Sequence, residues 1–208
     1  DVLIATIRKL LLKGGPQKLE QALTYIAGEV PDSGATRLMD LEAIRSGFEA
    51  ESLAWRELYT EPAPLEDILA GGFGRTYSKG RRIAAGFDKR KLPPASRLHR
   101  WRSFAKRSLY QHEIVRPVLC AESLTRMWYL ERIAALLGRH QDLHMLDELV
   151  RSSDLKGARR RVLRDFIAER ENVLAVKAMK LYPHAYGLSP RKLVDSLARE
   201  LSKLRLGR

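Results

Sequence analysis

Residues suited to binding phosphate gather in one short stretch of the chain, RLHRWRSFAKRSLYQHE, at 97–113. Within residues 97–111 the stretch carries five arginines and lysines and one histidine, and its first acid is Glu113 at the end. Arginine offers a flat fork of donors that binds phosphate oxygens in pairs, and lysine adds a point charge. A histidine beside phosphate should gain a proton and become a further cation. These residue types therefore predict an anion-binding site.

In a helix, this stretch would place its cations and its apolar side chains on different faces. At 100° per residue, His99, Arg102 and Lys106 fall within about 80° of one another, together with Tyr110. Like charges at this spacing destabilise a helix by about a few tenths of a kcal/mol per pair, and solvated helices normally mix acids with bases. An unneutralised stripe favours an anionic ligand over a merely solvated face. The separate apolar stripe is Leu98, Trp101, Ala105 and Leu109.

The preceding segment, GRTYSKGRRIAAG, repeats this pattern at residues 74–86. Arg75, Lys79 and Arg82 share one helical face at spacings i, i+4 and i+7. Each glycine in the segment costs a helix about 1 kcal/mol relative to alanine, which indicates close packing or close approach of a ligand. We expect the two helices, joined by a short basic loop, to face each other with their cationic stripes and form a groove.

Most of the excess positive charge lies in the region formed by these two segments. The chain has 208 residues and a net charge of +13, and residues 75–107 hold twelve basic residues against the single acid Asp88. That region therefore carries +11, and the other 175 residues carry only +2. Such asymmetry indicates a polyanionic partner: nucleic acid, an acidic membrane surface or a phosphate polymer.

The pattern of the whole chain predicts an all-α protein. Helix-forming residues dominate, strand-like alternation is absent, and proline and glycine clusters separate the segments. About nine helices with short loops favour a bundle of antiparallel helical hairpins in a single domain, 1–208. Helices are expected to end near 13–16, 29–34 and 59, and to span about 64–88, 97–116, 122–137, a short segment to 150, 155–182 and 189–204.

Few catalytic or metal-binding patterns can be found. The chain has no GxxxxGK[ST] loop, no HExxH motif and a single cysteine, so a P-loop and a zinc site lack support. His140 and His144 are four residues apart with Asp142 between them, but packing or anion contact is favoured over metal binding. No carboxylates are arranged for paired acid–base work. We therefore predict no catalytic residue, no metal and no cofactor, and a protein that is not an enzyme.

Cysteine use and hydropathy bear on the compartment. Cys120 cannot form an internal disulfide, which fits a reducing environment, and its apolar surroundings predict a buried small side chain. No apolar run approaches the roughly 18 residues that cross a bilayer, and the start of the chain does not resemble a signal peptide. A cytoplasmic protein without a membrane span is expected.

Nucleic acid remains an alternative partner. Proteins that bind single strands stack bases on exposed aromatic side chains. In the basic region these would be Tyr77, Trp101, Phe104 and Tyr110, of which Trp101 and Phe104 are expected in the core. No clear helix–turn–helix signature is present, so non-specific binding is the form of this alternative that stays open.

The sequence also resembles a known family, the CHAD domain (conserved histidine α-helical domain). LHRWRSFAKRSLY resembles the basic signature of the family, with His99, Arg102, Lys106 and Tyr110 at its characteristic positions. LLGRHQDLHMLDEL is similar to the helix–Leu-Gly–Asp–helix segment, and YSKGRRIAAG to the tyrosine–glycine–arginine helix. DVLIATIRKLL resembles the end of that Asp-containing segment in a first repeat, so the likeness covers essentially the whole chain.

The resemblance implies a helical bundle of two pseudo-repeats, about 1–92 and 93–208, around a basic central channel. It implies non-catalytic binding of inorganic polyphosphate in that channel, and in some members an association with polyphosphate granules. The first basic helix of the family, with its own histidine, would precede Asp1, so the first repeat is expected to be incomplete at its N-terminus. The run KRSLY also has one arginine fewer than the family pattern.

The leading prediction is a cytoplasmic module that binds inorganic polyphosphate, with no protein partner assigned. A non-specific nucleic-acid-binding protein and a basic scaffold for an acidic partner are the alternatives. An enzyme acting on a phosphate ester or anhydride is disfavoured, since 75–107 offers only Asp88. The residues predicted to bind the polymer are Arg75, Lys79, Arg82, His99, Arg102 and Lys106. A second group comprises Arg81, Arg100, Arg107, Arg139 and His140 at the edge of the site, with Lys177 and Lys180 from the weak repeat pattern.

Overall fold

The computed structural model describes residues 5–7, 17–29, 64–87 and 92–205, and every regular element in these ranges is helical. The prediction of an all-α protein is therefore confirmed for this part of the chain. The named elements are α2 (Gln17–Glu29), α4 (Leu65–Ala85), α5 (Ala95–Ile114), η1 (Arg116–Val118), α6 (Ala121–Ser152), α7 (Gly157–Tyr186), α8 (Pro190–Leu201) and η2 (Ser202–Arg205).

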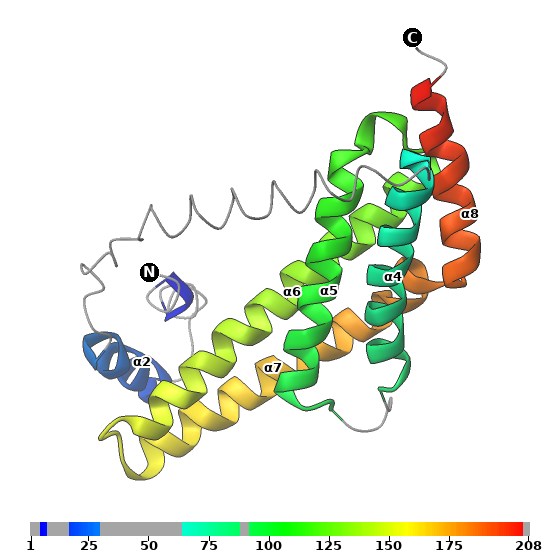
Figure 1. Cartoon of the computed structure of the whole chain (residues 1–208). Coiled ribbons are helices and arrows are strands. Elements are labelled where there is room, and N and C mark those ends of the chain that lie inside the picture. Colours follow the sequence, from blue (N-terminus) through cyan, green and yellow to red (C-terminus); the bar gives the residue numbers. More distant parts are fainter. Residues whose placement is uncertain (1–4, 8–16, 30–63, 88–91, 206–208) are drawn as a thin grey trace, which may run out of the picture.

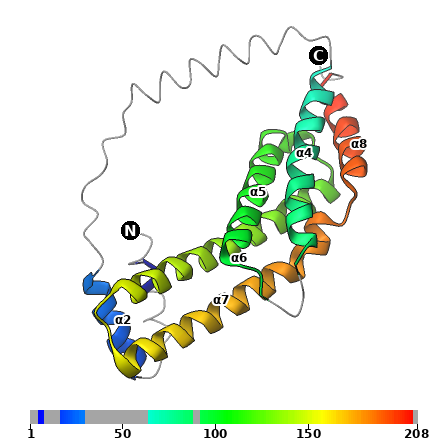
Figure 2. The same cartoon turned by 60° about the horizontal axis from the view of Figure 1, so that its bottom comes forward.

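The frame of the fold is the pair formed by α6 and α7, which contain 32 and 30 residues. They lie side by side and run in opposite directions along the length of the molecule (Figures 1 and 2). Gly157 begins α7 with a φ of +65°, a left-handed conformation that glycine adopts without the steric cost of a Cβ. The short connection 153–156 can therefore reverse the chain.

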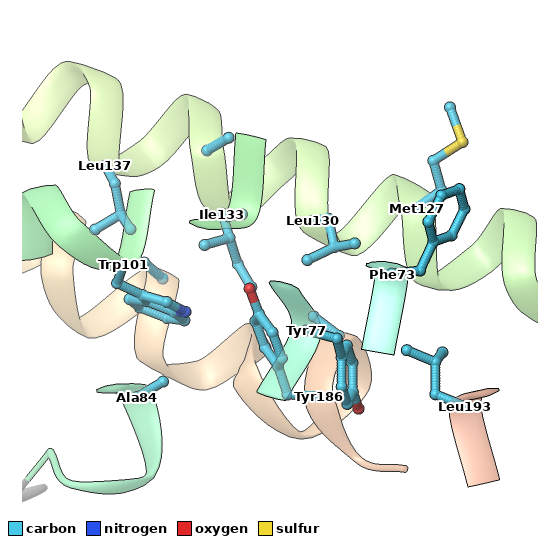
Figure 3. Close-up of a cluster of buried hydrophobic side chains, with 14 of the residues drawn as sticks. Phe73, Tyr77, Ala84, Trp101, Met127, Leu130, Ile133, Leu137, Tyr186 and Leu193 are labelled. Carbon is cyan, nitrogen blue, oxygen red and sulfur yellow. The ribbon is translucent and has the colours of Figure 1, made fainter. Parts of the chain in front are cut away.

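A large hydrophobic core lies at one end of this frame. There α4, α5 and α8 pack against the first half of α6 and the last part of α7. Trp101, Tyr77 and Tyr186 are its largest fully buried side chains, and Figure 3 shows them close to Leu130 and Ile133 of α6. Such aromatic burial supplies much of the hydrophobic free energy that fixes α4 and α5 in place.

A small hydrophobic core lies at the other end of the α6–α7 pair. Leu23 and Ile26 of α2 and the isolated Ile7 pack there with residues of α6 and α7, among them Leu146 and Ile167. Both cores therefore share the same two long helices, which run without interruption from one core to the other.

Polar side chains occupy the stretch of α6 and α7 between the two cores. His140 is 3% exposed, and burial, followed by the nearby charge of His144, lowers its pKa to about 4. His140 is therefore uncharged near neutral pH. Close by, the Nδ1 atom of His144 lies 3.5 Å from Oε1 of Glu171, whose pKa is raised by burial. Within the described ranges, no group of three or more histidine, cysteine or acidic side chains could hold a metal ion.

The predicted helix break at 138–142 is wrong, because α6 runs unbroken through it. Gly138 is instead a packing position: a Cβ there would lie 3.4 Å from Nε of Arg102 on α5. Likewise, Pro183 lies inside the last turn of α7, which ends at Tyr186 and not near 182. The helix expected to end near 59 and the break expected at 13–16 lie outside the described residues.

A buried carboxylate joins the end of α8 to the start of α6. Glu200 is 5% exposed and accepts hydrogen bonds from the backbone N–H of Cys120 (3.0 Å) and from its thiol (3.3 Å). The hydroxyls of Ser123 and Ser196 also donate to it, at 2.9 and 3.1 Å. Cys120 is thus half-buried rather than buried as predicted, and its thiol belongs to a polar contact.

The turn between α7 and α8 is held against α4 by two hydrogen bonds. The hydroxyl of Tyr77 donates to the carbonyl of Leu188 at 2.9 Å, and Nε of Arg81 donates to the carbonyl of Tyr186 at 3.2 Å. These bonds satisfy polar groups at the end of α7 that its own helix leaves unpaired. They also fix where α8 begins relative to α4.

Gly74 is required where α4 and α8 meet, because a Cβ built there would lie 2.3 Å from Cγ2 of Val194. We expect Gly74→Ala to lower the free energy of unfolding, since overpacking costs about 1–3 kcal/mol while better helix propensity returns only about 1 kcal/mol. In Gly74→Ala/Val194→Ala, the nearest remaining side-chain atom of residue 194 is its Cβ, which would lie 3.9 Å from the new Cβ of residue 74. Urea denaturation of the four proteins in this double-mutant cycle should show favourable coupling of about 1 kcal/mol or more. Additive effects would contradict the close contact.

Candidate functional site

The cations predicted on α5 form a stripe along the side of the helix that meets α6. We call His99, Arg102 and Lys106 the basic stripe. His99 is exposed, with Nδ1 lying 3.2 Å from Oε1 of Gln141 on α6, and the Arg102 guanidinium lies over Gly138. Nζ of Lys106 lies 5.4 Å from the centre of the Tyr110 ring. The opposing apolar stripe is confirmed: Leu98, Trp101 and Ala105 are buried, and Leu109 packs on the large core.

The basic stripe lacks acidic partners among the described residues. The ion pairs in that part of the chain join Arg116 to Glu113, His144 to two glutamates, and Arg151 and Arg164 to Asp147. Moreover, Nε of Arg102 is buried without a hydrogen-bond partner. A buried donor left unpaired costs about 1–3 kcal/mol, more when charged, so an acceptor placed beside Arg102 would be stabilised. The stripe therefore has unused capacity for an anion.

The cations predicted on α4 line a different hollow, formed with α8. We call it the α4–α8 groove; its volume is about 430 Å³. Its cations are Arg75, Lys79 and Arg82 from α4 and Arg191 from the first turn of α8. The remaining lining residues are Gly71, Gly74, Ser78, Pro190 and Val194.

The expected groove between α4 and α5, with the two cationic stripes face to face, is not what the structure shows. α4 lies between α5 and α8 in both views (Figures 1 and 2), and its cations line the side toward α8. Toward α5, α4 instead receives Arg97, which donates to the carbonyl of Ile83 at 3.3 Å and lies 5.1 Å from the Phe87 ring centre. The sequence predicts which residues share a cationic face within each helix. It does not predict how one helix is rotated about its axis relative to the other.

Comparison with known proteins places the chain in a family. A family model described as the CHAD domain matches residues 1–151, which is more than half of the chain. The chain belongs to the CHAD domain family. No curated protein and no solved structure shows a detectable match to it. The matched part of the CHAD chain includes α4, α5 and almost all of α6, and hence the whole basic stripe; α7 and α8 lie beyond it.

The second group of predicted residues in this CHAD chain contains members that are packed within the fold and members that are exposed. Arg81 bonds the end of α7, and the guanidinium of Arg107 lies 5.4 Å from the ring centre of Phe104. His140 is buried and uncharged, so in this conformation it does not reach a ligand at the surface. The exposed members are Arg100, Arg107, Arg139, Lys177 and Lys180.

Aromatic side chains offer little stacking surface beside the basic stripe. Tyr77 and Trp101 are fully buried, and Phe104 is half-buried under Arg107. Tyr110 is 56% exposed and lies next to Lys106. The expectation that Trp101 belongs to the core is confirmed. Of the four aromatic residues considered from sequence, one therefore remains available to a base.

Sequence reasoning missed Arg191 and Gln141. A signal for Arg191 was present, since Ser189 caps α8 with its side chain, Pro190 occupies the first turn, and both predict a helix start that would carry Arg191. Nothing in the sequence indicated that this helix start meets the basic face of α4. No helix in the described part of the CHAD chain is long and apolar enough to cross a membrane.

Proposed function

We propose that this CHAD chain binds inorganic polyphosphate, without catalysing a reaction on it, through the basic stripe on α5. The observation that carries the proposal is the unpaired state of the stripe: three predicted ligands along one helix side, no acidic partner among the described ion pairs, and a buried Nε of Arg102 without an acceptor. Membership of the CHAD family supports the same ligand, since the family resemblance implies polyphosphate.

The electrostatics of the stripe suit a flexible chain of phosphates. Arginine and lysine beside a dense polyanion release condensed counterions on binding, so affinity should fall as salt rises. Nucleic acid would share this term, but it would gain further affinity only from stacking or base contacts. With Tyr77 and Trp101 fully buried, Tyr110 is the one residue of those considered that could stack on a base, so that additional gain is small here. Polyphosphate is therefore favoured over single-stranded nucleic acid.

The finer architecture implied by the family forms part of the proposal. We expect two pseudo-repeats around a central basic channel, with the basic stripe as one wall of it. A cytoplasmic location, with association with polyphosphate granules, follows from the proposed ligand. Absence of catalysis fits the acid content of residues 75–107, where Asp88 stands alone among twelve bases.

A competition titration tests the proposal. Long-chain polyphosphate, single-stranded RNA and duplex DNA would compete for labelled protein at two salt concentrations. We expect polyphosphate to displace the other two at moderate salt by a factor of about 10 or more, because Tyr110 alone of the four aromatic residues considered offers the stripe a stacking surface. Equal competition by all three polymers, lost together as salt rises, would show a merely basic surface and would favour the nucleic-acid or scaffold alternatives.

A further inference from the structure

The two hydrophobic cores are separated on α6 by a short stretch that adds no apolar side chain to either of them. The large core ends on this helix at Leu137, and the small core begins at Leu143. We call the five residues between them, 138–142, the waist. His140 is the one buried side chain of the waist, so a titratable group fills the space between the cores on this helix.

His140 occupies a position at which an apolar side chain would join the two cores. It lies three residues after Leu137 and three before Leu143, so the three side chains share the buried side of α6. On α7 the cores adjoin, since Leu174 packs on the small core and Ala175 belongs to the large one. Contiguous apolar contacts make a region open cooperatively. An imidazole at this position therefore leaves two cores that can open separately.

The imidazole of His140 has no acidic partner that would balance a proton on it. None of the ion pairs among the described residues includes His140. Burial, and after it the charge of His144, lowers its pKa to about 4. A histidine with a lowered pKa in the folded state costs stability as the pH falls below its unfolded value, about 6.5. Acid should therefore favour any opening that returns His140 to water.

Other charged and titratable groups surround the waist on all three helices that meet there. They are Arg139, Asp142, His144, Asp147, Glu148 and Arg151 on α6, Arg164 and Glu171 on α7, and His99 and Arg102 on α5. His144 contacts carboxylates of both long helices, at 3.5 Å from Glu171 and 3.8 Å from Glu148. The carboxylates described here thus pair with His144 and with arginines, and leave His140 unneutralised.

We propose that the waist is an acid-sensitive joint, at which the small core and α2 open as one unit while the large core stays folded. Proton binding to His140 drives the opening, because the imidazole then gains solvent and loses its proximity to His144. The joint also carries part of the support of the basic stripe, since His99 contacts Gln141. Opening would release this contact, whatever ligand the stripe binds.

Hydrogen exchange of the free protein, followed by mass spectrometry at a pH of about 7.5 and of about 5, tests the joint after correction for the intrinsic rates. Residues 143–167 should exchange through an opening that is more populated than the opening of 123–137 and 175–186. Its equilibrium constant should rise by about 30-fold at the lower pH, because the pKa of His140 is about 4 when folded and about 6.5 when exposed. Equal protection of the three segments would show one cooperative unit and would overturn the proposal.

Two substitutions of His140 separate its charge from its place between the cores. His140→Gln keeps a polar waist that cannot take up the proton, so the opening should persist without its rise at acid pH. His140→Leu should also abolish the rise and, by joining the cores, should bring the protection of 143–167 to that of the large core. All other titratable groups are common to these proteins, so the difference belongs to His140.

His184→Gln is the matched control, because His184 is exposed near the end of α7 and stacks on Tyr129 at the large core. It should retain the full rise between the two pH values. A rise that persists in His140→Gln, or one that is lost in His184→Gln, would overturn the role of His140. Unchanged protection of 143–167 in His140→Leu would overturn its place as the break between the cores. Far-ultraviolet circular dichroism confirms that each variant remains helical.

Discussion

Arg102→Glu/Lys106→Glu is expected to abolish binding of long-chain polyphosphate, with a loss of affinity of at least about 100-fold. Each side chain would lose a charge-assisted contact worth about 1.5–3 kcal/mol, and each glutamate would add repulsion toward the polymer. The variant should still fold, because the apolar side of α5 that holds it in the large core is unchanged. Fluorescence anisotropy with labelled polyphosphate measures the affinity, and far-ultraviolet circular dichroism measures the helix content.

The control for this double reversal is Arg159→Glu/Arg161→Glu. Both residues are exposed in the first turns of α7, at the end of the α6–α7 pair away from α5 (Figure 1). The net charge changes equally in the two variants. A comparable loss of affinity in the control would therefore show that binding depends on the total charge and not on the basic stripe. Loss of helix content in Arg102→Glu/Lys106→Glu would instead give the stripe a structural role. The milder Arg102→Gln/Lys106→Gln then shows whether binding can be lost in a folded protein.

Glu200→Ala is expected to lower the free energy of unfolding by about 3 kcal/mol or more. The substitution leaves the backbone N–H of Cys120 and the hydroxyls of Ser123 and Ser196 without their acceptor. Hydrogen bonds to a charged group contribute about 1.5–3 kcal/mol each, and buried donors left unpaired are costly. Urea denaturation measures the change, with Glu131→Ala as the control: Glu131 is exposed on α6, and its replacement should cost less than about 0.5 kcal/mol.

Glu200 also predicts a pH dependence of stability. Burial raises its pKa, but the hydrogen bonds from Cys120, Ser123 and Ser196 outweigh burial and leave the pKa lowered. A carboxyl with a lowered pKa in the folded state contributes stability that is present above its unfolded value, about 4.3, and is lost as the pH falls through the folded value. Parent protein should therefore lose stability below about pH 4 more steeply than Glu200→Gln. Parallel curves for the two proteins would show that the carboxylate is not stabilised as described.

The helices themselves could be predicted because their signals are local. Period-3.6 apolar patterns and proline or glycine at segment ends gave α2, α4, α5 and α8 to within a few residues. The exception is Gly138, which predicts a helix break from sequence but lies inside α6. Glycine stands there because the Arg102 side chain of another helix packs over it, and a single sequence does not show such a contact. The same limit applies to Gly74, whose partner Val194 is more than a hundred residues away.

The candidate site could be predicted in composition but not in arrangement. His99, Arg102 and Lys106 share a helix, so their common face followed from spacing alone. Their relation to Arg75, Lys79 and Arg82 depends on the packing of α4 between α5 and α8, which the apolar residues of three helices decide together. Arg191 could not be found for the same reason. Burial likewise removed His140 from the surface cations, although its residue type suited the predicted role.

The hydrogen bond between Tyr77 and Leu188 spans 111 residues of chain, which has a consequence for protein synthesis. The ribosome makes α4 long before α8, and chains fold progressively as they emerge. Until Leu193, Leu197 and Leu201 arrive, the large core lacks one of its helices, and the face of α4 around Gly74 stays open to solvent. The nascent chain thus exposes the cations of α4 on an incompletely folded domain, close to the RNA of the ribosome. Docking of α8 completes the α4–α8 groove around them, so the order of translation delays formation of this groove until the fold is nearly complete.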